Sequence, residues 1–193
     1  MTEPESLEAA IHEHVQIVPY DVAWPDRFEA ERARLLALFP DEFIAIEHFG
    51  SAAIPGMSAK PIIDILGGVG SWDGVNALSR RLCENGYSTS AEFNATLSDR
   101  QWFMRWANGR RTHHLHVVVH EADPWRDRLA FRDRLRADPD APSRTHQDHP
   151  RRTAPAGSRG LHGREGRVCA ILPSLEARIG HDRTVATVCL RVG

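Results

Sequence analysis

FIAIEHFGSAAIPGMSAKPIIDILGGV, residues 43–69, contains two apolar segments separated by a stretch of small residues. The first, 43–49, alternates in side-chain polarity, and the second, 62–69, is apolar except for Asp64, so both patterns predict β-strands. Gly50 and the Pro55-Gly56 pair interrupt the chain between them, which is typical of a loop. The stretch therefore predicts two strands, with one carboxylate on the second.

Helical periodicity appears on both sides of this stretch. The predicted helices cover residues 25–39, 72–85 and 124–137. Two further strands are predicted over residues 101–107 and 113–120. They are joined at Asn108-Gly109, a dipeptide that favours a tight hairpin turn. The whole pattern predicts an α+β fold with a mixed or antiparallel sheet.

The composition limits the class of protein. With 193 residues, of which 41% are hydrophobic and 26% charged, the chain can form one domain with a substantial core. It has no run of 18 apolar residues to cross a membrane, and its acidic N-terminus lacks the features of a secretion signal. Three widely spaced cysteines do not indicate a disulfide framework. We therefore expect a cytoplasmic protein, and a net charge of −2 does not favour a nucleic acid as its partner.

The Gly50-Ser51 pair and Asp64 form the first candidate site. A Gly-Ser turn lets backbone N–H groups approach a phosphate without a Cβ in the way. A carboxylate on the neighbouring strand can hold a divalent cation that bridges phosphate oxygens, and Lys60 lies close in sequence. In the alternative interpretation, Asp64 pairs with Lys60, Arg105 or Ser51 and only fixes the loop, because an unpaired buried carboxylate is costly.

Histidines and arginines supply the other candidates. His114 and His116 are two residues apart on a predicted strand, so both face one side, where they could bind zinc, contact phosphate or transfer a proton. The alternatives are an exposed polar face or a core histidine. Arg132 and Arg136 share a helix face, which is either an anion clamp or a solvated surface. Arg105 lies between aromatic residues, as a stacked structural arginine or a phosphate ligand.

Five segments in this order resemble the GrpB family: Pro19 to Pro25, Glu47 to Gly56, Lys60 to Ile65, His114 to Val117, and Phe131 to Arg136. The resemblance implies a cytosolic protein with a nucleotidyltransferase-like fold, a small mixed sheet flanked by helices, from a largely uncharacterised family. In some bacteria a GrpB-like domain is fused to dephospho-CoA kinase, but the kinase P-loop pattern is absent from this sequence.

The residue types at these positions favour a nucleotide or a phosphorylated small molecule as the ligand. The residues then expected to contact phosphate are Gly50, Ser51, His48, Lys60, Arg105 and Arg132. The expected catalytic residues are Asp64, His116 and Lys60, and the expected ligands of a single Mg²⁺ or Mn²⁺ ion are Asp64, His114 and His116.

The site departs from active nucleotidyltransferases, which carry two acids one residue apart after the Gly-Ser turn. Asp64 matches one of them, but the alternate position, Ile62, is apolar. Two functions therefore stay open. One is a metal-assisted, nucleotidyltransferase-like enzyme, and the other is an accessory binding domain that keeps the pocket without turnover.

The last part of the chain has a different composition. We predict that residues 1–142 form the domain and that 143–193, rich in Arg, His and Pro, form a poorly ordered tail. GrpB proteins similar to this one continue with a segment containing Tyr and Lys, and neither residue type occurs here after Tyr87. We hypothesise that the reading frame slips near Pro142-Ser143. Stop codons in the shifted frame of the gene would exclude this hypothesis.

Overall fold

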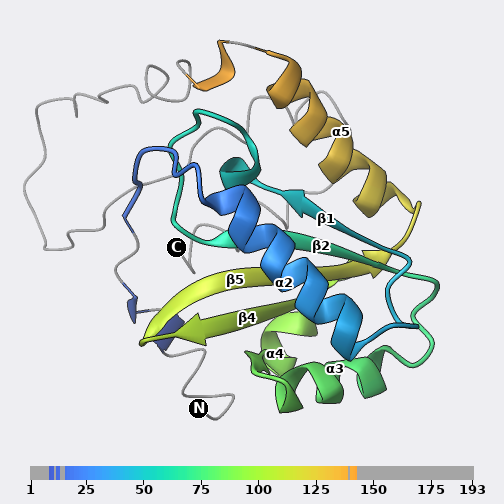
Figure 1. The fold of residues 1–193 in the computed structure, drawn as a ribbon. Coiled ribbons are helices and arrows are strands. Elements are labelled where there is room, and N and C mark those ends of the chain that lie inside the picture. The colour runs from blue at the N-terminus through green and yellow to red at the C-terminus, as the bar shows by residue number, and fades with distance from the viewer. Residues whose placement is uncertain (1–8, 11, 14–15, 139, 143–193) are drawn as a thin grey trace, which may run out of the picture.

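A mixed five-stranded sheet forms the centre of the fold (Figure 1). The computed structural model describes residues 9–10, 12–13, 16–138 and 140–142, so the predicted tail, 143–193, lies outside the described residues. The elements in chain order are α2 (Trp24–Leu38), β1 (Ala45–Phe49), η1 (Ser51–Ala53), β2 (Ile63–Val69), α3 (Val75–Glu84), β3 (Tyr87–Ser88), α4 (Ala91–Asn94), β4 (Gln101–Ala107), β5 (Arg110–Val119) and α5 (Asp123–Ala137). This confirms the predicted α+β class.

The order of the strands in the sheet is β1-β2-β5-β4-β3, so β1 is an edge strand. β2 and β5 are parallel, whereas the other neighbours are antiparallel. The register pairs Asp64 of β2 with Phe49 of β1 on one side and with His114 of β5 on the other. The predicted turn between β4 and β5 is present, with positive φ angles at Asn108 and Gly109.

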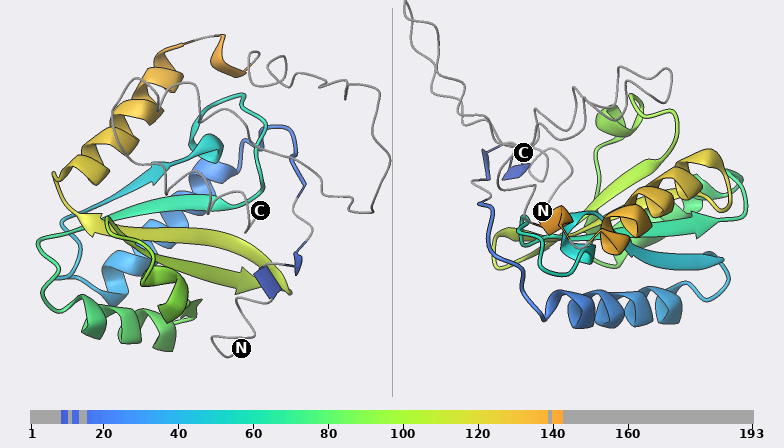
Figure 2. Two further views of the ribbon diagram at one scale, coloured as in Figure 1. Left: turned by 180° about the vertical axis from the view of Figure 1, so that it is seen from behind. Right: turned by 90° about the horizontal axis from the view of Figure 1, so that it is seen from above.

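The two faces of the sheet are covered differently. One face carries the main core, in which Ile63, Ile65 and Leu115 pack beneath α2 and α3. Successive residues of a strand point to opposite faces, so Asp64 and His114 lie on the other face. Figure 2 shows α2 along one side of the sheet, with α5 running beside β1.

The second face is covered by two smaller apolar groups. α5 packs Trp125 against Leu66 and Val118, next to the β1 edge. Trp102 and Met104 of β4 form the other group, with Phe93 of α4 against the Trp102 ring. The polar residues of β2 and β5 lie between these two groups. Within the described ranges, no helix combines the length and the apolar character needed to cross a membrane.

Candidate functional site

Three metal-ligand side chains converge on the second face of the sheet. Asp64 Oδ1 lies 3.3 Å from His114 Nδ1, and the ligand atoms of Asp64, His114 and His116 all lie within 4.8 Å of one another. The parallel pairing of β2 with β5 produces this cluster, because Asp64 is opposite His114 and His116 follows two residues later on the same face. The side chains expected to hold a metal are thus adjacent.

Aromatic rings orient the two imidazoles. The Trp102 ring lies edge-on to His114 at 5.2 Å, and Phe49 lies edge-on to His116 at 5.1 Å. His114 Nε2 and His116 Nδ1 are buried and have no hydrogen-bond partner in the part of the chain that the structure describes. Burial, followed by the charges of Arg100, His114 and Arg128, lowers the pKa of His116 well below its usual value. His116 is therefore neutral near pH 7, which is the form that binds a metal.

Gly50 lets the turn after β1 approach Asp64. Its φ of 73° and ψ of −178° are open almost only to glycine. A Cβ at this position would overlap Asp64 Oδ2 and lie 3.0 Å from its Cγ. Ser51, the first residue of η1, is exposed, and Lys60 is half-buried three residues before β2. The Gly50-Ser51 turn therefore lies directly beside the Asp64 carboxylate, as the predicted phosphate site requires.

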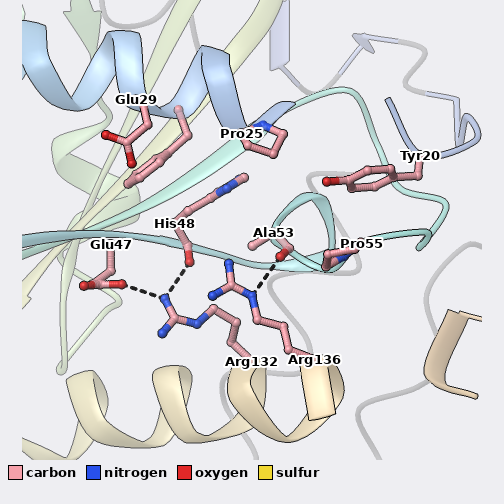
Figure 3. A pocket seen from close by; sticks show the side chains of 10 residues that line it. Tyr20, Pro25, Glu29, Glu47, His48, Ala53, Pro55, Arg132 and Arg136 are labelled. Atoms are coloured by element: carbon pink, nitrogen blue, oxygen red, sulfur yellow. Dashed lines mark hydrogen bonds and ion pairs between the residues drawn. The ribbon is translucent and has the colours of Figure 1, made fainter. Parts of the chain in front are cut away.

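His48 and Arg132 lie elsewhere, in a pocket at the edge of the sheet (Figure 3). His48 points to the core face, where its ring stacks on Phe28 of α2 at 4.8 Å. Arg132 of α5 donates to Glu47 Oε2 at 2.7 Å and to the His48 carbonyl oxygen at 2.9 Å. Arg136, one turn later, donates to the Ala53 carbonyl at 3.0 Å. Arg132 is buried and bonds to groups of β1, so the solvated-surface alternative is wrong for it, whereas Arg136 is exposed and bonds to η1.

Burial sets the charge states around this pocket. Desolvation, opposed by Asp64 and reinforced by Arg136 and Arg132, lowers the pKa of His48 to about 4. Burial also disfavours the charged form of Arg132, but its hydrogen bonds with Asp133 and Glu47 outweigh that cost and raise its pKa. The pocket thus combines a neutral imidazole with charged guanidinium groups.

Arg105 is not brought to the Asp64 cluster. In the β4–β5 register it is opposite His113, so it lies on the core face, where it forms an ion pair with Glu31 of α2. Glu31 is 4% exposed and also accepts hydrogen bonds from the Tyr87 hydroxyl at 2.8 Å and from Arg34 at 2.9 Å. The structure therefore supports a structural role for Arg105, which forms an ion pair with Glu31.

Arg105→Met should therefore lower stability without affecting ligand binding. We expect a loss of about 1–3 kcal/mol in the free energy of unfolding, because the buried Glu31 carboxylate loses one of its partners, and unchanged affinity for phosphate compounds. Urea unfolding and calorimetric titration measure the two effects, and Arg110→Met, at an exposed arginine of β5, is the control. A selective loss of phosphate affinity in Arg105→Met would restore its role as a ligand.

Comparison with known proteins decides the family. The family model described as GrpB protein matches residues 14–152, which continues beyond the predicted boundary at residue 142. The chain belongs to the GrpB family. It is 40% identical over 125 residues to the UPF0157 protein YqkA of Bacillus subtilis strain 168, and this match covers 65% of the chain and 36% of YqkA.

Two further GrpB proteins are similar. The glutamate-rich protein GrpB of Alkalihalophilus pseudofirmus is 36% identical over 129 residues, covering 65% of this chain and 73% of the relative. The crystal structure of the conserved protein GrpB from Enterococcus faecalis superposes with a TM-score of 0.60 at 30% identity, covering 68% of this chain and 79% of that one. The GrpB fold is therefore shared, while the match to YqkA spans only about a third of that protein.

Three polar residues of the edge pocket of this GrpB chain, Tyr20, Glu29 and Glu47, were not predicted from the sequence as site residues. Tyr20 precedes α2 and Glu29 lies within it, whereas His48 belongs to β1. The Pro19-Tyr20-Asp21 motif indicated only a turn. Tyr20 lies just before a helix that covers β1, and this position could have indicated that it lines the pocket. That indication is available only when the fold is known.

Proposed function

We propose that this GrpB chain binds a nucleotide or a phosphorylated small molecule through a single divalent metal ion held by Asp64, His114 and His116. The observation that carries the proposal is the cluster itself: one carboxylate and two imidazoles within 4.8 Å of one another. Two buried imidazole nitrogens of this cluster have no hydrogen-bond partner among the described residues. Buried polar atoms are usually satisfied, and a bound ion would take one ring nitrogen of each imidazole.

The donor set fits a first-row transition ion better than Mg²⁺. Mg²⁺ prefers six oxygen ligands, whereas imidazole suits Zn²⁺ and also binds Mn²⁺. When bound, such an ion supplies positive charge that polarises phosphate oxygens. The chain's own contribution is to orient the ligands, through the 3.3 Å contact between Asp64 and His114 and through the aromatic walls.

The neighbouring residues would contact the phosphate. The Gly50-Ser51 turn, packed against Asp64, offers backbone N–H groups and an exposed hydroxyl. Lys60 ends the same loop and would add the positive charge that a phosphate group requires. In the enzyme form of the proposal, Asp64 holds the metal, and His116 assists in nucleotidyl or phosphoryl transfer.

One observation favours the second candidate, binding without turnover. Two-metal phosphoryl transfer needs a second carboxylate beside the first. The residues two before and two after Asp64 are Ile62 and Leu66, which are apolar and 3% and 0% exposed. A phosphate-binding accessory domain would need only the single-metal cluster and the Gly-Ser turn.

Metal titration tests the proposal. We expect Mn²⁺ or Zn²⁺ to bind at one equivalent by calorimetry. Loss of an outer-shell partner of a metal ligand typically weakens metal binding roughly 10- to 100-fold. Asp64 is proposed as a direct ligand, so Asp64→Asn should weaken binding by more than that. Asp73→Asn, at an exposed aspartate before α3, is the matched control. Absence of stoichiometric binding, or equal binding by Asp64→Asn, would exclude the site.

Nucleotides then separate the two candidates. A panel of nucleotides and phosphorylated metabolites should raise the melting temperature only when the metal is present, because a ligand of the folded state stabilises it. Product formation with the shifting compound supports the enzyme, and its loss in Asp64→Ala with folding retained excludes a purely structural role. Binding with no product supports the accessory domain. No metal-dependent shift with any compound contradicts both.

A further inference from the structure

A second cavity lies on the other side of β1 from the proposed metal cluster. It has a volume of about 290 Å³ and is enclosed by the start of α2, the end of β1, η1 and α5 (Figure 3). This volume is at the lower limit of typical small-molecule sites. His48 lines the cavity on the core face of the sheet, whereas Asp64 lies on the opposite face. The two sites therefore do not share a side chain.

Two uncharged polar side chains, those of His48 and Tyr20, line this cavity. His48 is 6% exposed, and its Nε2 atom is buried without a hydrogen-bond partner in the described part of the chain. Figure 3 shows the His48 ring and the Tyr20 hydroxyl pointing towards each other across the cavity. An unsatisfied buried nitrogen costs about 1–3 kcal/mol, so its retention at this position points to a ligand that bonds to it.

The two arginines of the cavity differ in their ion pairs. The Arg132 charge is compensated by Glu47 and Asp133, at 2.7 Å and 2.8 Å. Arg136 also lines the cavity, but its one hydrogen bond is to a carbonyl oxygen, and it has no ion-pair partner among the described residues. Burial and the neighbouring Arg132 charge lower the pKa of Arg136, although a guanidinium stays protonated. Arg136, which is exposed, can therefore pair with an anion that enters from solvent.

The surrounding groups select the kind of anion. A guanidinium binds the two oxygens of a carboxylate or phosphate in parallel. Glu29 and Glu47 also line the cavity, and their negative charges disfavour a doubly charged phosphate. The remaining wall is apolar and includes Phe28, Pro25 and Pro55, which suits a small hydrocarbon or aromatic body.

We propose that this cavity binds a small organic monocarboxylate. Its carboxylate pairs with Arg136 and accepts a hydrogen bond from His48 Nε2 or the Tyr20 hydroxyl, and its apolar body lies against Phe28 and the two prolines. This site, at the β1 edge of the sheet, is separate from the proposed metal site, so the chain has two ligand sites.

Benzoate is the probe, with uncharged benzamide and inorganic phosphate for comparison. We expect benzoate to bind with a Kd of about 1 mM. At about ten times this concentration, it should raise the melting temperature by a few degrees. Benzamide and phosphate should have little effect. Arg136→Gln should abolish the benzoate shift, and Arg134→Gln, at the exposed arginine two residues earlier on α5, should retain it.

Two further variants keep the test decisive. His48→Phe preserves the stack on Phe28 but removes Nε2, so it should alter the benzoate shift in melting temperature, and it provides a second variant if Arg136→Gln fails to fold. In the wild type, ¹⁵N NMR of the histidine rings should show the His48 signal move with benzoate. Asp64→Asn should leave the benzoate response intact, which separates this site from the metal site. No response to benzoate, a stronger response to phosphate, or a response kept in Arg136→Gln overturns the proposal.

Discussion

Lowering the pH from 7 to 4 should reduce the free energy of unfolding by about 6 kcal/mol through His48 and His113. Burial, the first cause in both cases, lowers the pKa of each imidazole from 6.5 to about 4. For His48 the charges of Arg136 and Arg132 add to burial, and Asp64 opposes it. A whole domain is typically stable by only about 5–15 kcal/mol, so the loss is large enough to unfold the chain.

The direction follows from proton uptake. In the unfolded chain both imidazoles bind a proton as the pH falls through 6.5, but in the folded chain they do so only near pH 4. Between these values the unfolded state holds more protons, so acid favours it. The stabilisation is fully present above pH 6.5 and is lost as the pH falls to about 4. His116, whose pKa burial also lowers, adds to the loss in the same direction.

Urea unfolding at a series of pH values measures this loss. His48→Phe keeps the ring that stacks on Phe28 and removes the titrating nitrogens, so it should reduce the acid-induced loss by about 3 kcal/mol. His12→Asn, at an exposed histidine, is the control and should keep the wild-type pH dependence. If the free energy of unfolding falls as steeply with pH in His48→Phe as in the wild type, the buried His48 ring is not a cause of acid unfolding.

The elements with strong local signals could be predicted from the sequence. The apolar run around Asp64 and the Asn108-Gly109 turn each form the structure their residues favour. β3 has two residues and α4 has four, too few for a hydrophobic period to appear. Short elements of this kind are fixed by tertiary contacts, such as the packing of Phe93 on Trp102.

The candidate site depended on pairing that no local pattern contains. Asp64 and His114 meet because β2 and β5 are parallel neighbours in one register, and a shift of one residue would place them on opposite faces. The same alternation excludes Arg105, which lies opposite His113 rather than His114 and so points towards α2. Sequence motifs identified the residue types, while the register decided which of them could act together.

Gly50→Ala should destabilise the fold by about 3 kcal/mol or more and weaken metal binding at Asp64. A non-glycine residue in this backbone region costs about 1–3 kcal/mol, and the new Cβ would overlap the Asp64 carboxylate. Relief of that overlap must move either the Gly-Ser turn or the carboxylate, and the latter would disturb the 3.3 Å contact with His114. Urea unfolding and calorimetric metal titration measure the two effects.

Gly74→Ala is the control for backbone conformation. Gly74 has a φ of 77°, close to that of Gly50, but its Cβ would meet no atom within 4 Å. Its left-handed helical conformation costs a non-glycine residue about 1–2 kcal/mol, and we expect no change in metal affinity. A loss of metal affinity in Gly74→Ala as large as in Gly50→Ala would show that general destabilisation, and not proximity to Asp64, reduces binding.

A double variant divides the Gly50→Ala effect between backbone strain and overlap. Asp64→Ala removes the Oδ2 and Cγ atoms that the new Cβ would meet. If overlap contributes, Gly50→Ala should cost less in the Asp64→Ala background than in the wild type, with an interaction energy of about 1 kcal/mol or more. Equal costs in both backgrounds would assign the whole effect to the backbone. In that case Gly50 serves only the turn, whereas a measurable interaction energy shows that the turn and the carboxylate are held together as one unit.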